Sequence, residues 1–170
     1  MNKLKQTLNQ DFVKSSVIFQ VLWFALVMFG EQYFFISLII FVFWVTTQKI
    51  PIKAWSFVLL LTSVGVTFDY GLFIFQGYQF SNDQFPFWLM MLWLCFSRYL
   101  YDMLNHFQWH WLAWFVMGAI FGPLAYVAAS KFDVVTITAE SWYFIPPFWA
   151  AILVFSKVVL NKFQFDLNPQ

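Results

Sequence analysis

Long apolar runs separated by short polar turns organise this chain. The first run, Val17 to Thr47, is interrupted only by Gly30-Glu31-Gln32, and similar runs follow almost to the end of the chain. About 20 apolar residues suffice for a helix to cross a bilayer. The pattern therefore predicts an all-α polytopic membrane bundle, a single membrane domain over residues 1–170. Its six predicted spans cover residues 16–30, 32–47, 54–76, 86–105, 109–129 and 141–160.

The first run could form one long helix or a hairpin of two short ones. Its halves are near or below the usual minimum of about 17 residues for a span. Lys14 precedes the run and Lys49 follows it, and loops rich in lysine and arginine tend to stay on the cytoplasmic side. A hairpin keeps both lysines on that side, so we expect a turn at Glu31.

Charge distribution then predicts the orientation of the whole bundle. With six spans and both termini cytoplasmic, a single lysine, Lys131, falls outside, which agrees with the preference for positive inner loops. Glu31, Asp83, Asp133 and Glu140 fall outside as well. The lysines on the expected cytoplasmic side are Lys3, Lys5, Lys14, Lys49, Lys53, Lys157 and Lys162.

Composition supports the membrane assignment and excludes several functions. The chain is 62% hydrophobic and 10% charged, whereas soluble domains are about 25% charged. A net charge of +1 offers no basic field for nucleic acid, so we expect membrane lipids and a membrane protein as partners. The single cysteine, Cys95, excludes an intramolecular disulfide and a cysteine cluster. The sequence shows no catalytic motif and implies no cofactor.

Ionisable residues within the apolar runs are the candidate site. Charged groups are costly in hydrocarbon, and they mark functional sites by default. Arg98 and Asp102 lie one helical turn apart, so they are expected to pair; Asp69 lies in another span. The pair either holds the spans together or forms a pathway or anion site. Asp69, Arg98, Asp102 and Asn105 are the ligand or pathway candidates, and Tyr70, Thr67 and Gln76 are local partners for Asp69.

Asp102, His106 and His110 recur every four residues. On one unbroken helix they would share a face and could ligate zinc or iron. A turn is expected between Asn105 and Gln108, however, and it would break this spacing. The histidines are therefore weak metal candidates, and an interfacial position beside tryptophans is favoured.

Four motifs are spread over nearly the full length of the chain. They are Phe19-Gln20-x-x-Trp23, Gly65-x-x-x-Asp69-x-x-x-Phe73, Phe87-Trp88-Leu89-x-x-Leu92-Trp93-x-x-Phe96 and Gly122-Pro123-Leu124-Ala125-Tyr126. With these motifs the chain resembles a bacterial family of small inner-membrane proteins, domain of unknown function 2878. The resemblance implies a multi-pass protein of the bacterial inner (cytoplasmic) membrane, with no assigned activity and a link to membrane-lipid modification.

Two functions of different classes fit these observations. The first is a non-enzymatic accessory or scaffold subunit. The second is a small transporter or lipid-handling protein that uses Arg98, Asp102 and Asp69. A carrier needs an open polar cavity that reaches Arg98, whereas in a scaffold the pair is sealed by packing.

Overall fold

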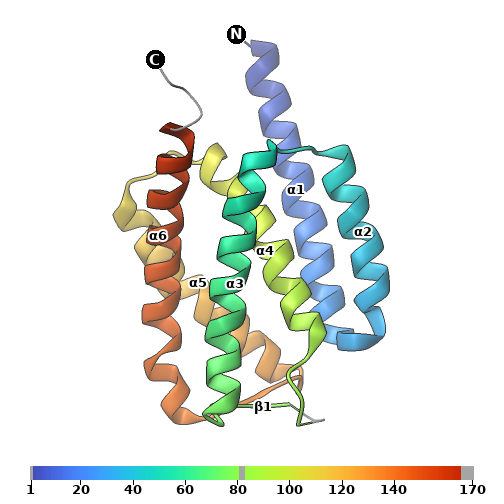
Figure 1. Ribbon diagram of the computed structural model, residues 1–170, viewed down its shortest axis with the longest axis vertical. Coiled ribbons are helices and arrows are strands. Elements are labelled where there is room, and N and C mark those ends of the chain that lie inside the picture. Colours follow the sequence, from blue (N-terminus) through green and yellow to red (C-terminus); the bar gives the residue numbers. More distant parts are fainter. Residues whose placement is uncertain (1, 81–82, 166–170) are drawn as a thin grey trace. The chain divides into compact units, whose positions relative to one another are not determined.

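The computed structural model describes residues 2–80 and 83–165, with side chains over 9–80 and 83–162. Helices make up most of the described chain, which confirms the all-α prediction (Figure 1). The α-helices are α1 (Asn2–Phe29), α2 (Phe34–Thr47), α3 (Ile52–Ile74), α4 (Phe87–His106), α5 (Trp111–Lys131) and α6 (Ile145–Phe165). Two 3-10 helices, η1 (Gly30–Tyr33) and η2 (Ala139–Tyr143), and two paired antiparallel strands, β1 (Tyr78–Gln79) and β2 (Thr136–Ile137), complete the described elements.

Four helical segments of the described residues are long and apolar enough to cross a membrane. The first of them, Asn9–Thr47, takes in α1, η1 and α2 together, and α4 with its Arg98 and Asp102 is not among them. The structure therefore supports a multi-pass membrane protein with four candidate spans. The count of six and the orientation of the termini stay predictions. The four segments are Asn9–Thr47, Ile52–Ile74, Trp111–Lys131 and Ala139–Lys162.

The exposed surface of α2 shows why hydrocarbon suits this protein as solvent. Phe35, Ile39 and Phe43 recur every four residues, so they share one helix face, and they are 73%, 69% and 63% exposed. Soluble monomers rarely expose a contiguous apolar surface of this kind. The opposite face of α2 buries Ser37, Phe41 and Trp44.

The chain reverses direction at η1, where the sequence predicts a hairpin. Gly30 has a φ of +55°, a conformation that glycine adopts without the steric cost of a side chain. Helices α1 and α2 then run side by side in opposite directions (Figure 1). The Ser15 hydroxyl in the middle of α1 lies 2.7 Å from the Gln48 side chain at the end of α2.

The described chain divides into two compact units. The first unit comprises residues 1–63 and 87–108, and the second comprises 64–86 and 109–170. In the first unit α4 packs against α1 and α2, and Leu22, Leu26 and Leu100 are among its fully buried residues. Helix α3 contributes its first half to one unit and its second half to the other.

Close packing of α5 against α6 organises the second unit. A Cβ added to Gly118 would lie 2.2 Å from the Trp149 carbonyl oxygen, and one added to Gly122 would lie 2.1 Å from the Trp149 ring. The two glycines are therefore required for the approach of α6. Pro123 lies within α5 without ending the helix. Gly118-x-x-x-Gly122 is the small-residue spacing typical of packed membrane helices.

Candidate functional site

Arg98 and Asp102 form the ion pair that their spacing on α4 predicts. Arg98 Nη1 lies 2.6 Å from Asp102 Oδ1, and the two side chains are 2% and 18% exposed. A buried guanidinium is very costly unless it is paired and hydrogen-bonded. Arg98 Nη2 also donates to the backbone oxygen of Gln48 at 2.9 Å. Gln48 is the C-cap residue of α2. The arginine thus ties α4 to the end of α2.

Helix α1 joins the same network through Ser15. Its hydroxyl lies 2.6 Å from Asp102 Oδ2 and 2.7 Å from Gln48 Oε1, and the residue is 1% exposed. Trp44 Nε1 donates to the same Gln48 oxygen at 3.0 Å. We call these five residues, Ser15, Trp44, Gln48, Arg98 and Asp102, the α1–α2–α4 junction. It brings together side chains from three helices of the first unit.

The Ser15 hydroxyl carries one proton and faces two acceptors. A serine hydroxyl donates one hydrogen bond at a time, so it donates either to Asp102 or to Gln48. Donation to an ionised carboxylate is the stronger of the two. Gln48 Oε1 then accepts its hydrogen bond from Trp44 Nε1, so both side-chain acceptors that face Ser15 have a donor.

Two aromatic rings lie near the guanidinium. The Arg98 Cζ atom lies 5.1 Å from the centre of the Trp44 ring and 6.0 Å from that of Tyr101. Both distances are within the range of a cation–π attraction, which strengthens when the cation is desolvated. Arg98 Nε is buried and has no hydrogen-bond partner among the described residues. The junction therefore seals the charge by packing as well as by pairing.

The remaining candidate residues do not belong to the junction. The Asn105 side chain donates to the Tyr101 backbone oxygen at 2.8 Å, so it bonds within its own helix. The His106 ring stacks on Phe12 of α1, with centroids 4.2 Å apart. His110 lies outside α4 and caps α5, where its Nδ1 accepts from the Leu112 amide at 3.4 Å.

The predicted turn between the fourth and fifth apolar segments is confirmed. Helix α4 ends at His106 and α5 begins at Trp111. The regular spacing of Asp102, His106 and His110 is thus interrupted before the third residue. Over the part of the chain that the structure describes, no group of three or more His, Cys, Asp or Glu side chains could hold a metal ion.

Asp69 belongs to the second unit and is fully buried. Its Oδ1 accepts from the Tyr126 hydroxyl of α5 at 2.8 Å, a contact between residues 57 positions apart. The expectation of a local partner missed this bond. Tyr78 of β1 is 2% exposed, and its ring lies 5.7 Å from that of Tyr126. Burial raises the pKa of the Tyr78 phenol, and the nearby Tyr126 and Asp69 raise it further.

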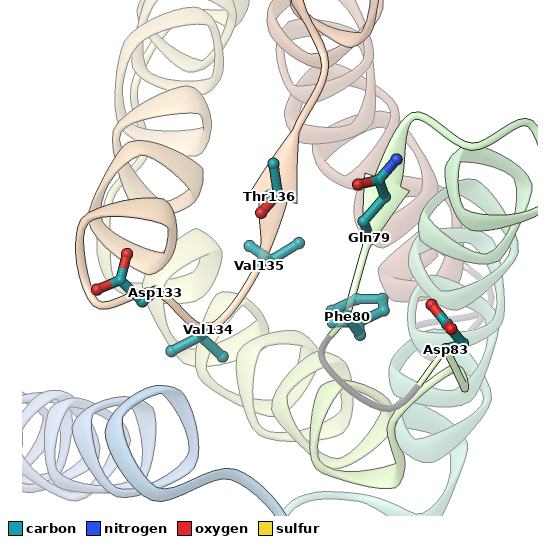
Figure 2. A pocket seen from close by; sticks show the side chains of 7 residues that line it. All are labelled: Gln79, Phe80, Asp83, Asp133, Val134, Val135 and Thr136. Carbon is teal, nitrogen blue, oxygen red and sulfur yellow. The ribbon is translucent and has the colours of Figure 1, made fainter.

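A pocket of about 240 Å³ lies beside the short strands of the second unit. Figure 2 shows that Asp83 and Asp133 lie on opposite sides of it. The two carboxylates therefore do not converge on one point. Arg98, Asp102 and Asp69 do not line this pocket. Its lining residues are Gln79, Phe80, Asp83, Asp133, Val134, Val135 and Thr136.

Sequence reasoning did not identify the polar partners Ser15, Gln48 and Tyr126 of these clusters. Ser15 and Gln48 lie in or beside apolar runs, where a serine or glutamine is a common interfacial residue. Their signal is weak: each is a polar side chain at a depth that a paired arginine on another span could reach. Tyr126 carried a clearer signal, since buried tyrosine hydroxyls usually find a hydrogen-bond partner.

The fold and its clusters define a class: a multi-pass helical membrane protein whose buried ionisable groups bond to other parts of the chain. The chain belongs to the family described as Protein of unknown function (DUF2878), whose model matches residues 12–155. This confirms the family resemblance. No curated protein and no solved structure matches the chain.

Proposed function

We propose that this protein is a non-enzymatic accessory or scaffold subunit of a bacterial inner-membrane assembly. The sealed state of Arg98 carries the proposal. A carrier must expose its charged group to a substrate, yet the Arg98 side chain is 2% exposed. It contacts a carboxylate, a helix C-terminal carbonyl and an aromatic ring of its own unit. This arrangement favours a structural role for the pair.

The proposed topology has six spans and both termini in the cytoplasm. Cysteines introduced at Gln32 and at Lys49, each in a Cys95→Ser background, test it. In intact cells a maleimide that cannot cross the membrane should label the cysteine at position 32 and spare the one at 49. Equal labelling of both positions before permeabilisation would exclude the hairpin orientation.

The scaffold proposal is tested by what copurifies with the tagged protein. The protein is extracted from its native membrane in mild detergent, and protein and lipid mass spectrometry are run on the same sample. A stoichiometric membrane protein is the expected result. If that partner is a lipid-modifying enzyme, the proposed link to membrane-lipid modification is supported too.

A second candidate, a lipid-handling protein or small transporter, is supported by Arg98 Nε. This donor is buried and has no hydrogen-bond partner among the described residues, so an anionic headgroup could use it. The same lipid measurement tests this candidate. A specific anionic lipid that is lost in Arg98→Leu, retained in Lys14→Leu and unaccompanied by a partner protein would replace the scaffold proposal. Lys14 is a suitable control because it is an exposed cation of the same unit.

A further inference from the structure

Three oxygen-bearing side chains meet in the core of the second unit. Asp69 of α3, Tyr126 of α5 and Tyr78 of β1 are 0%, 9% and 2% exposed. The Tyr126 hydroxyl donates to Asp69 Oδ1 at 2.8 Å, and the rings of Tyr126 and Tyr78 lie 5.7 Å apart. We call these three residues the Asp69 cluster. They come from three separate elements, so only the folded unit brings them together.

The Tyr78 hydroxyl is the observation that indicates a ligand. It makes no hydrogen bond of ordinary geometry to the described residues, yet Asp69 and Tyr126 are near enough to raise the pKa of its phenol. A buried hydroxyl without a partner is costly, and buried tyrosine hydroxyls usually find one. A small bound species that contacts all three oxygens of the cluster would satisfy it.

The charge of the Asp69 cluster favours a cation as this species. An ionised carboxylate is costly in an apolar interior unless a positive charge or hydrogen bonds compensate it. Carboxylate and hydroxyl oxygens are ligands of hard cations. The cluster holds one carboxylate, so a monovalent ion balances its charge, whereas a divalent ion would leave a buried positive charge uncompensated.

Aromatic rings beside the cluster also suit a cation. The Trp149 ring of α6 lies 6.1 Å from the Tyr126 ring, and the Phe80 ring lies 6.2 Å from the Tyr78 ring. The face of an aromatic ring attracts a cation, and the attraction strengthens when the cation is desolvated. The surroundings of the three oxygens are therefore apolar without repelling a positive charge.

The pocket of the second unit offers an approach from water. Asp69 lies about 8 Å from the end of α3 by the rise of an α-helix. Phe80 lines the pocket and neighbours Tyr78, so two adjacent rings connect the pocket to the cluster. Asp83 and Asp133 lie on opposite sides of the pocket and are exposed (Figure 2). Carboxylates around an opening raise the local concentration of cations, which is the role that these two acids fit.

We propose that Asp69, Tyr126 and Tyr78 bind a monovalent alkali cation in the core of the second unit. The carboxylate supplies the negative charge, and the two phenols supply neutral oxygen ligands. Tyr126 donates its proton to the carboxylate, and its oxygen keeps lone pairs for the ion. The ion joins α3, β1 and α5, so it stabilises the unit. This inference does not depend on the accessory function proposed above.

Equilibrium binding of radioactive sodium and rubidium to the purified full chain tests the site, with rubidium as the tracer for potassium. The protein is held in mild detergent at neutral pH, with choline chloride as the background salt because choline is too large to replace an alkali ion. We expect a single tracer ion per chain, displaced by an unlabelled alkali chloride. If neither tracer binds, the proposal is overturned, and ordered water is the partner of the Tyr78 hydroxyl.

Matched variants separate this site from other cation binding. Asp69→Asn keeps the shape of the side chain and removes its charge, so it should abolish binding. Tyr78→Phe removes a hydroxyl that bonds to no described residue, so it should fold, and it decides the test if Asp69→Asn does not fold. It should bind the ion about tenfold more weakly, as for one lost contact to a charged group.

The control is Tyr143→Phe, which changes a tyrosine of the same unit that is 80% exposed. This variant should bind the ion as wild type does. Two outcomes besides the absence of binding overturn the proposal. One is wild-type affinity in Tyr78→Phe or in folded Asp69→Asn, and the other is an equal loss of affinity in Tyr143→Phe and Tyr78→Phe.

Discussion

Removal of the Asp102 carboxylate is the most direct test of the α1–α2–α4 junction. Asp102→Leu leaves the Arg98 guanidinium, whose side chain is 2% exposed, without its counter-charge. Breaking a buried ion pair on one side costs about 3–5 kcal/mol. The Gln48 carbonyl and the Trp44 ring still contact the cation. We therefore expect the lower end of that range, about 3 kcal/mol, which is about a hundredfold in the unfolding equilibrium.

The double variant Arg98→Met/Asp102→Leu separates a lost attraction from an unpaired charge. Apolar replacement of a whole buried pair is often neutral or stabilising, so the double variant should recover most of the stability lost in Asp102→Leu. The control is Asp11→Leu/Lys14→Met. That pair is 3.9 Å apart, with side chains 52% and 63% exposed, and such pairs contribute at most about 1 kcal/mol.

Equilibrium unfolding in mixed detergent micelles, followed by tryptophan fluorescence, gives these free energies. Two results would refute the reasoning. If Asp102→Leu is as stable as wild type, Arg98 is not paired as the structure shows. If the double variant is as unstable as the single one, the loss comes from packing around residue 102 and not from an unpaired cation.

Three further predictions concern the second unit. Gly122→Ala places a methyl carbon 2.1 Å from the indole of α6 and should cost at least about 1–3 kcal/mol of unfolding free energy, whereas Gly71→Ala, with nothing within 4 Å, should be neutral or stabilising. Tyr126→Phe removes the donor to a buried carboxylate and should cost about 1–3 kcal/mol; Tyr70→Phe, at an exposed position, should cost little in the same assay. The pKa of the Tyr78 phenol is raised, so this phenol should stay neutral in alkali. Tyr78→Phe should therefore leave the tyrosinate absorbance unchanged at pH about 11, which is just above the usual tyrosine pKa.

Local sequence rules predicted the parts of this protein that depend on local chemistry. Long apolar runs predicted membrane helices, because a helix bonds its own backbone polar groups where lipid offers no partners. Helix α2 exposes Phe35, Ile39 and Phe43, as a membrane helix would. The pair of Arg98 and Asp102 was predictable because residues four apart on a helix are neighbours. The turn between α4 and α5 was predictable as well, because a second span-length apolar run begins at Trp109.

Only the tertiary structure decided which distant residues meet. Ser15 bonds to Asp102, 87 positions along the chain, and Gln48 bonds to Arg98, 50 positions along. In the second unit, Tyr126 bonds to Asp69 over a separation of 57 positions. A polar residue in an apolar run shows that a partner is needed, but many helix arrangements could supply one. Which partner is reached depends on the depth and rotation of each helix. Both are determined by packing, such as that of Gly118 and Gly122 against α6. The sequence by itself therefore determined that buried charges must be satisfied, and the packed helices determined by which residues.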